Sequence, residues 1–454
     1  MGYMSKTGRR PNELASKTSH VHIINDKVVE NFINDCILPK SADEVDFSSY
    51  NLYSVKNDIK LPINHIFAID GGYTEIHIKN EFPSSTLSFF QFGASGFSID
   101  DLDDIANKPF ISPDDISKLK NIERFKLVLP TKNIIIKNEK NLINSVRKTI
   151  YNFFKNEPKE KESLTKSNFL NTLSWFLFEE YREKEKQTRQ WNLSNCPCCG
   201  HSNIKLSKED MSALYTFQCS ECRETIYLTD FFRLHEAVDN ELGAGGILGY
   251  LTNLLEHVVL IHLIKTVLEV KKSLLNEMLL IKDGPLGFFG QTANLHKPMR
   301  SLTNHLFETS NLFLAGLEKS GAFVEHANEI SKKMDPGTVL LLDNKYIYKY
   351  IIPGDPDSQD PYARTSYYSG KLIYKSKDER MYVVTLPIEN AEILLSPKIT
   401  DYKNIDVILK TIEKLKCDMY DNALIPIALV NKLVSLSNHP SSVILEKFAK
   451  KSMN

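Results

Sequence analysis

Two apolar segments of this chain each end in an aspartate followed by a glycine, and this repeated pattern constrains the fold most. Asp70 ends the apolar run of HIFAIDGGYTEIHI, and Asp283 ends that of MLLIKDGPLGFFG. Such runs predict buried strands. If the strands are neighbours in one sheet, both aspartates lie at the same edge, where two carboxylates repel unless a cation joins them. Oxygen ligands suit Mg²⁺ or Mn²⁺, although Asp-Gly is also ordinary turn chemistry.

A third acid, Glu256, comes from the long apolar helix that we expect over about residues 247–272. From Glu256 to Lys272 is sixteen residues, or roughly 24 Å at ~1.5 Å each. From Glu277 to Asp283 is six residues, or roughly 20 Å at ~3.3 Å each. A helix packed antiparallel to the second strand therefore brings Glu256 level with Asp283. A solvated surface charge is the alternative, but NLLEHVVLIHL contains little else that is polar, and a charge among apolar residues needs a partner.

The order of the remaining elements predicts an α/β fold with a mixed sheet. A chain of 454 residues is long enough for two or three domains. A meander of three strands, with GG and NEFPSS as its turns, is followed by alternating helices and strands. The expected meander strands are 66–70, 73–79 and 86–92. We divide the chain into a first core part (1–97), an inserted helical region (98–245) and a second core part (246–454).

Five of the seven cysteines fall within residues 196–222, which is typical of a metal site rather than of a disulfide framework. CPCC and CSEC supply two C-x2-C pairs, and two such pairs provide the four thiolates of a closed structural zinc site. Four buried thiols are the alternative, but they do not explain the paired spacing. We expect the segment between the pairs to form the hairpin of a zinc ribbon, with Cys198 as a spare thiol. The predicted zinc ligands are Cys196, Cys199, Cys219 and Cys222.

Charge and hydropathy limit the classes of partner. The formal net charge is −1, so any contact with nucleic acid must come from local patches rather than from a global basic field. The longest apolar segment, VVLIHLIKTVLEV, is too short and too charged to span a bilayer. No secretory signal pattern is visible at the N-terminus, and we expect a cytoplasmic protein without a membrane partner.

The sequence resembles the NurA nuclease family. The matching segments are FAIDGGYTE, LLEH and IKDGPL, together with LEKSGAFVEHA, LLLDNKYIYKYI, GKLIYKSKDERMYVVTLP and the N-terminal GRRPNELASKTSH. The resemblance covers roughly residues 1–100 and 245–435 and leaves the zinc-ribbon region as an insert. It implies an RNase H-like core and a Mn²⁺- or Mg²⁺-dependent DNA nuclease, with exonuclease and single-strand endonuclease activity. It also implies that Asp70, Glu256 and Asp283 are the metal ligands.

The same resemblance implies partners. Members of the family act at DNA ends as homodimers beneath a HerA-type hexameric ATPase translocase. The sequence leaves open whether the role is end resection in DNA repair or defence against phage. It also does not fix the polarity of cleavage.

Other candidate site residues are predicted from their positions at the ends of apolar strands or after Asp283. Lys319 ends an apolar strand and is expected near the scissile phosphate. The residues after Asp283 could contact phosphates, although a loop and helix cap explain them equally well. Asp343 also ends an apolar strand, where a turn is the simpler interpretation. Where the family has a C-terminal tyrosine and histidine, this chain has Tyr420 but Asn431, and His439 is a distant substitute. The expected DNA-contacting residues are Gln291, Thr292, His296, Arg300 and Tyr420.

Two other functions fit parts of the sequence. IDGGYTE resembles the first phosphate loop of the actin, sugar-kinase and Hsp70 superfamily, which would make the protein a phosphotransferase or ATPase. That superfamily needs further glycine-rich phosphate and adenosine loops, which we do not find. The other alternative is a non-catalytic zinc-ribbon adaptor that binds DNA or a protein partner, and the three acids argue against it.

Overall fold

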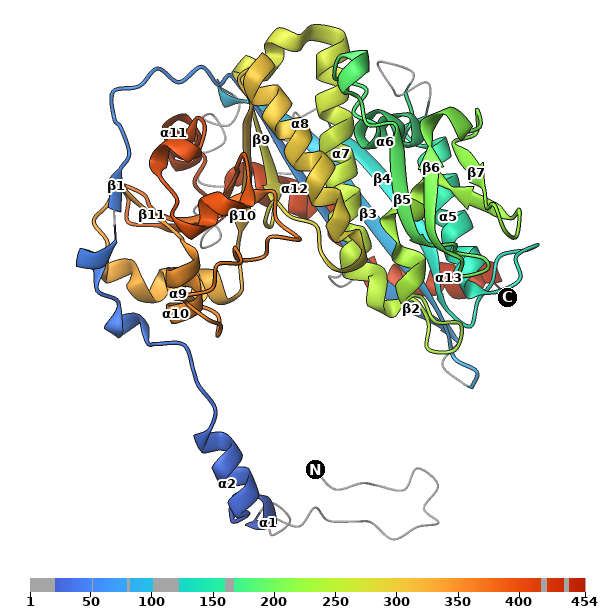
Figure 1. Ribbon diagram of the computed structural model, residues 1–454, viewed down its shortest axis with the longest axis horizontal. Coiled ribbons are helices and arrows are strands. Elements are labelled where there is room, and N and C mark those ends of the chain that lie inside the picture. The colour runs from blue at the N-terminus through green and yellow to red at the C-terminus, as the bar shows by residue number, and fades with distance from the viewer. Residues whose placement is uncertain are drawn as a thin grey trace.

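The computed structural model describes residues 21–50, 52–79, 82–100, 122–159, 167–417, 423–436 and 441–453. Within these residues, nine strands form one mixed sheet in the order β1-β11-β12-β13-β10-β9-β2-β3-β4 (Figure 1). The strands are β1 (Leu52–Ser54), β2 (His65–Lys79), β3 (Ser85–Ser98), β4 (Ile122–Lys132), β9 (Met278–Asp283), β10 (Phe313–Glu318), β11 (Thr338–Leu341), β12 (Ser369–Lys375) and β13 (Met381–Pro387).

The middle of the sheet has the RNase H-like arrangement that the sequence predicts. Strands β2, β3 and β4 form an antiparallel meander. Strand β9 then adds parallel to β2, and β10 adds parallel to β9. The two strands that carry the predicted acids are therefore direct neighbours. The expectation of an α/β fold with a mixed sheet is confirmed.

The predicted meander differs from the observed one at the glycines. Gly71 and Gly72 do not form a turn, because β2 runs through them and they pair with Phe92 and Gln91 on β3. A side chain at Gly71 would place its Cβ 2.9 Å from the Cβ of Phe92 and 3.3 Å from the Oε1 atom of Glu256. The glycine thus permits a close approach between β2, β3 and the helix that carries Glu256.

The third strand of the meander is β4 rather than residues 86–92, which belong to β3. Strand β4 lies within residues 98–245, which we predicted as an insert, and it forms an edge of the core sheet. Exposed Arg124, Lys126 and Val128 alternate with buried Phe125, Leu127 and Leu129, which is the pattern of a half-buried strand. The core sheet therefore extends into the range predicted as an insert.

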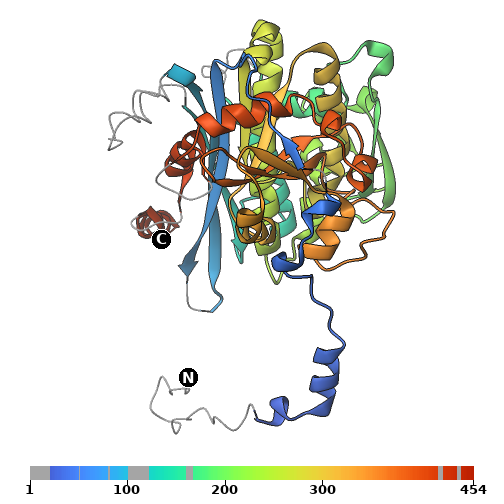
Figure 2. The ribbon, with the colours of Figure 1, turned by 90° about the vertical axis from the view of Figure 1, so that its left-hand side faces the viewer.

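Helices cover both faces of the sheet. Helices α5, α6, α7 and α8 share one hydrophobic cluster with β3 and β4, whereas α11 and α12 share a second cluster with β10 and β13. Figure 2 shows α12 and α13 on one side of β2 and α7 on the other. The helices are α1 (Val21–Ile24), α2 (Lys27–Asn34), α5 (Leu142–Asn156), α6 (Phe169–Leu177), α7 (Leu248–Lys271), α8 (His296–Thr309), α9 (Ala322–Ile330), α10 (Asn344–Tyr350), α11 (Ile405–Lys414), α12 (Ile425–Val434) and α13 (Ser441–Met453).

Helix α7 is the central helix of the first face. Within the described residues, one helical segment, Gly245–Glu277, is long and apolar enough to cross a membrane, and 72% of its most apolar window is buried inside the protein. Leu251, Leu255 and Ile264 of this helix are fully buried. This burial is the pattern of a core helix packed on a sheet.

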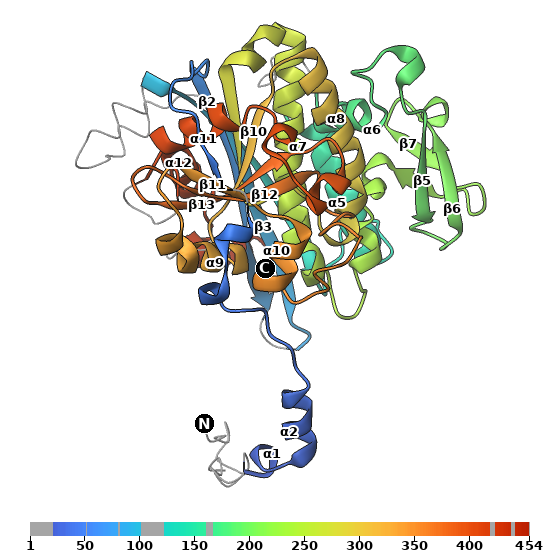
Figure 3. The ribbon, with the colours of Figure 1, turned by 60° about the vertical axis from the view of Figure 1, so that its left-hand side comes forward.

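The cysteine region consists of two short hairpins beside α5 and α6 (Figure 3). Strand β5 (Gln190–Asn195) pairs with β6 (Ser202–Ser207), and β7 (Thr216–Gln218) pairs with β8 (Thr225–Tyr227). Each C-x2-C pair closes one hairpin, whereas the sequence suggested a single hairpin between the pairs. The reason is local, because each first cysteine accepts a backbone hydrogen bond from the residue four positions later.

Candidate active site

Asp70 and Asp283 lie level with each other on adjacent strands. Ile69 of β2 is in register with Lys282 of β9, so the next residue on each strand is an aspartate. Ile281 belongs to the hydrophobic cluster under α11 and α12. Since side chains alternate along a strand, Asp283 points to the same face as Ile281. Ala68 is in that cluster too, which places Asp70 on the face of Asp283.

Asp70 is a buried carboxyl group whose hydrogen bonds are incomplete. Its side chain is 3% exposed, and Oδ1 accepts a 2.7 Å hydrogen bond from the N–H of Gly71. Its Oδ2 atom is buried and has no hydrogen-bond partner among the residues that the structure describes. Burial, followed by the negative charges of Asp283 and Glu256, raises the pKa of Asp70 to about 8. Such a group is stable only when it is protonated or bound to a cation.

Glu256 approaches the site from the opposite side of the sheet, on α7. It is 6% exposed, and its Oε2 atom lies 2.6 Å from the Nζ atom of Lys282. Burial raises the pKa of Glu256, and the positive charge of Lys282 opposes the shift. Strand β9 ends at Asp283 while β2 continues. The Oε1 atom of Glu256 lies beside Gly71, two residues past Ile69, where the pairing of β2 with β9 ends.

Asp283 forms the more open side of the site. Its Oδ2 atom accepts a 2.7 Å hydrogen bond from the Nζ atom of Lys319, and both side chains are partly exposed. The backbone N–H of Gly284 donates to the carbonyl of Leu317 at 2.7 Å, which holds the end of β9 against β10. Lys319 follows β10 by one residue, so the predicted lysine is indeed beside one of the predicted acids.

The three carboxylates interact electrostatically but do not form a compact cluster of ligand atoms. Among the described residues, one group of three or more potential metal ligands has all its ligand atoms within 4.8 Å of one another, and this group is the cysteine cluster. Glu256 and Asp283 are instead each paired with a lysine. The donor set still fits a hard divalent cation, because it consists of carboxylate oxygens and because the Oδ2 atom of Asp70 is buried without a partner.

The residues predicted to contact phosphates have internal partners. Arg300 donates from Nη2 to the carbonyl of Tyr367 at 2.6 Å. Buried His296 contacts the carbonyl of Ala293 through Nδ1 at 2.7 Å. Thr292 donates to the carbonyl of Phe289. These contacts match the alternative interpretation of a loop and helix cap.

Gln291 is partly buried, and its Oε1 atom has no partner among the described residues. Asp343 is the N-cap of α10, and its side chain accepts from the N–H of Tyr346 at 2.6 Å. Asp343 therefore has a structural role at the start of α10, in agreement with its simpler interpretation as a turn residue. Tyr420 and His439 lie outside the described residues.

Two features of the site were not predicted from the sequence. The end of α12 covers β2 beside Asp70, because Gln91 donates to the carbonyl of Leu433 and a Cβ at Gly72 would lie 3.7 Å from the carbonyl oxygen of Val434. The second feature is Lys282, which is 1% exposed. A lysine between four apolar residues and an aspartate on a buried strand is itself a signal that could have identified it.

The four predicted zinc ligands do meet. Their sulfur atoms all lie within 4.8 Å of one another, with 3.9 Å between Cys196 and Cys222 and 3.8 Å between Cys199 and Cys219. Burial opposes ionisation of Cys219, but the N–H groups of Cys222 and Glu221 outweigh it and lower the pKa of Cys219 to about 7. This arrangement could hold one tetrahedral ion.

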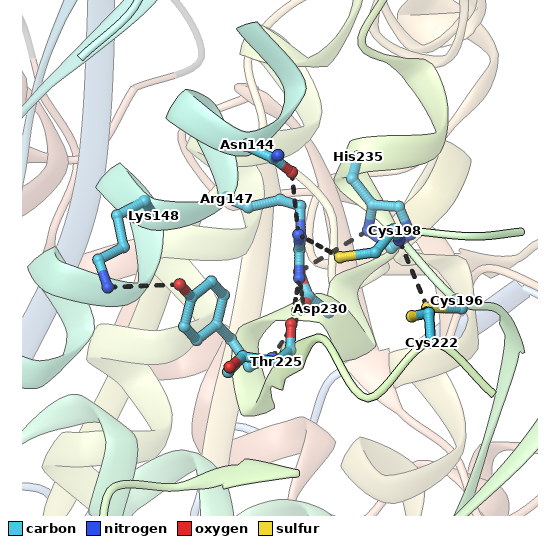
Figure 4. A network of polar contacts seen from close by, with 10 residues as sticks. Asn144, Arg147, Lys148, Cys196, Cys198, Cys222, Thr225, Asp230 and His235 are labelled. Carbon is cyan, nitrogen blue, oxygen red and sulfur yellow. Dashed lines mark hydrogen bonds and ion pairs between the residues drawn. The ribbon is translucent and has the colours of Figure 1, made fainter. Parts of the chain in front are cut away.

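A buried arginine joins the cysteine region to α5 (Figure 4). Arg147 forms a two-point ion pair with Asp230 at 2.7 and 2.8 Å. It also donates to the carbonyl of Thr225, to Asn144 and, at 3.3 Å, to the sulfur of Cys198. All five N–H donors of the guanidinium group are therefore used. The spare cysteine is thus part of a structural contact.

Comparison with known proteins gives a weak structural match. No protein-family model matches the chain, and no curated protein sequence matches it. The crystal structure of the NurA nuclease from Sulfolobus solfataricus matches 97% of this chain and 98% of its own, with 8% identity and a TM-score of 0.33. A second crystal structure of NurA matches 97% and 99%, with 13% identity and a TM-score of 0.26. The functional assignment rests on the site itself.

Proposed function

We propose that this protein is a divalent-metal-dependent DNA nuclease whose metal ligands are Asp70, Glu256 and Asp283. The observation that carries the proposal is the Oδ2 atom of Asp70, which is buried without a partner beside two further carboxylates. Repulsion among these three acids falls when a cation lies among them. Oxygen donors favour Mn²⁺ or Mg²⁺ over softer ions.

Each residue has a distinct task in this proposal. When bound, the ions would activate water and stabilise the leaving 3′-oxygen of a phosphodiester. Asp70 would supply the central ligand, and Gly71 and Gly72 leave the backbone beside it bare. Lys319 is partly exposed and can exchange its contact with Asp283 for one with a phosphate oxygen of the substrate. Gln291, His296, Arg300 and Tyr420 stay predictions as DNA contacts.

The two alternative functions have less support. A phosphate loop of the actin type needs a turn whose N–H groups face the ligand, but Gly71 and Gly72 lie within a continuous strand and pair with β3. A non-catalytic adaptor gives no reason to bury Asp70 and Glu256 so close together. The nuclease accounts for both observations.

We also propose that the cysteine cluster binds one structural Zn²⁺ ion, by the four-thiolate count. Metal analysis of protein purified without chelator should therefore find about one zinc per chain. The site has no open position, so the zinc takes no part in cleavage. Protein that is folded and contains no zinc would refute this assignment.

The partners follow from the family resemblance. They are DNA, a HerA-type ring translocase and a second copy of this chain, in a cytoplasmic role in DNA repair or phage defence. The net charge of −1 supports weak intrinsic DNA binding. Binding to duplex by this chain alone should therefore show a shallow salt dependence, with a log–log slope of about −0.9 per phosphate contact. Digestion of long linear duplex should rise sharply with translocase and ATP, whereas efficient, salt-resistant digestion by the chain alone would contradict this role.

The nuclease proposal is tested by single substitutions. Asp70→Asn, Glu256→Gln and Asp283→Asn should each abolish Mn²⁺-dependent cleavage of linear DNA without unfolding the protein. Glu269→Gln is a suitable control, because Glu269 lies on the same helix as Glu256 and pairs with Lys265. The control should cleave at the wild-type rate. If Asp283→Asn also cleaves at that rate, the assigned site is wrong.

A further inference from the structure

Lys282 is a buried lysine at the centre of the candidate site. It is 1% exposed and lies on β9, immediately before Asp283. Burying an ammonium group is costly unless it is paired and hydrogen-bonded. Valine or isoleucine would satisfy the apolar strand equally well. The lysine therefore needs an explanation in terms of what its charge contacts.

The ammonium group of Lys282 joins two of the three acids. Its Nζ atom lies 2.6 Å from the Oε2 atom of Glu256. It also donates a 2.7 Å hydrogen bond to the backbone carbonyl of Asp283. One contact fixes a side chain of α7, and the other fixes the end of β9. The relative position of Glu256 and Asp283 is thus set through a single nitrogen atom.

These contacts engage Oε2 of Glu256 and leave its Oε1 atom facing β2. With Oε2 held by Lys282, Oε1 lies beside Gly71, where a Cβ atom would be 3.3 Å away. Gly71 directly follows Asp70 on β2. The Oε1 atom is therefore directed toward the strand that carries the unpartnered Asp70 oxygen.

The next residue on α7, His257, has partners other than Lys282. Its Nδ1 atom lies 2.7 Å from the carbonyl oxygen of Asn253. Its other neighbour is the ring of Phe288, with centroids 4.2 Å apart. The ammonium charge is thus directed to Glu256.

We propose that Lys282 is a positioning residue that anchors Oε2 of Glu256 and the end of β9, so that Oε1 of Glu256 is presented to the bound cation. This inference rests on the proposed metal-dependent function. Lys282 itself touches neither metal nor substrate. Groups that orient metal ligands in this way typically change metal affinity by about 10–100-fold when they are removed.

The chain supplies a matched control. Lys265 is 4% exposed and lies on α7, where its Nζ atom is 2.6 Å from the Oε1 atom of Glu269. It is thus a second buried lysine paired with a glutamate, but near the other end of the helix. Replacing it removes a buried lysine and its ion pair with a partly exposed glutamate, without touching the three acids.

Calorimetric titration of the full-length, zinc-containing protein with MnCl₂, in the absence of DNA, tests the proposal. Lys282→Met should bind Mn²⁺ about 10–100-fold more weakly than the wild type, whereas Lys265→Met should stay within about twofold. Thermal melting of both variants measures the loss of stability that comes from removing a buried lysine. Unchanged or tighter Mn²⁺ binding by Lys282→Met would overturn the proposal. A wild-type protein that binds no Mn²⁺ would instead refute the proposed function.

A second pair of variants covers the case in which methionine prevents folding. Lys282→Arg keeps a positive donor beside Oε2 of Glu256 and should retain most of the Mn²⁺ affinity. Lys282→Gln keeps a polar side chain without the charge and should show the 10–100-fold loss. Equal Mn²⁺ affinity of these two variants would show that the charge does not position Glu256, and the proposal would fail.

Discussion

The cysteine region and the carboxylate site are both candidate metal centres, but they are built in opposite ways. The four cysteine sulfurs lie within 4.8 Å of one another, and each pair is set by a local hairpin. The three acids come from β2, α7 and β9, and two of them are paired with lysines. The first centre is preformed by nearby residues, whereas the second depends on strand register and helix packing. We therefore expect metal to determine stability at the first and activity at the second.

The largest effect on stability should come from removing zinc. Structural zinc contributes about 10–16 kcal/mol in zinc-finger peptides, and here Leu193, Phe217 and Ile226 of the hairpins belong to the main hydrophobic cluster. Cys219→Ser or a strong chelator should therefore lower the melting temperature of the whole protein. Cys198→Ser should have a much smaller effect, because this thiol is not among the four. Equal melting of Cys219→Ser and wild type would contradict the structural role.

Loss of the arginine that ties this region to α5 should have the next largest effect. Arg147 and Asp230 are almost fully buried, and breaking such a pair costs about 3–5 kcal/mol because one charge is left alone. Urea unfolding of Arg147→Met should show this loss. The double variant Arg147→Met/Asp230→Leu should recover much of it, since no charge stays buried. A double variant that is less stable than Arg147→Met would argue against the ion pair as the cause.

At the carboxylate site, the corresponding test is the pH dependence of stability without divalent metal. The pKa of Asp70 is about 8 in the folded protein and about 3.9 in an unfolded chain. Between these values the folded state holds a proton that the unfolded state has lost. Stability should therefore fall as pH rises from about 4 to 8, by at most about 1.4 kcal/mol per unit from this group. Asp70→Asn should flatten that slope in chemical unfolding, and an unchanged slope would contradict the assignment.

The smallest effect on stability should come from Lys319. Its ion pair with Asp283 is partly exposed, and exposed pairs contribute about 0–1 kcal/mol. If Lys319 contacts the phosphate, Lys319→Ala should reduce cleavage by about 10²–10³-fold, as for other groups that stabilise developing charge. Cleavage kinetics would measure the loss of activity, and thermal melting would show that stability changes little. A large loss of stability with normal cleavage would reverse the assigned role.

Features that follow from a local sequence pattern were predicted correctly. The apolar runs before Asp70 and Asp283 identified two neighbouring strands, and the cysteine spacing identified four sulfurs that do meet. The sequence failed where tertiary contacts override local chemistry. Gly71 and Gly72 suggested a turn, but the close approach of Phe92 and Glu256 requires glycine within a strand. Lys282 was overlooked because its role depends on a helix that packs on the other side of its strand.

Anomalous diffraction from crystals soaked in MnCl₂ would locate the divalent ions themselves. We expect a manganese peak within bonding distance of Oδ2 of Asp70, shared with Asp283 and with Oε1 of Glu256. A separate zinc peak should lie among the four cysteine sulfurs. If no manganese peak appears beside Asp70 at a Mn²⁺ concentration that supports cleavage, Asp70 is not a ligand of the catalytic metal.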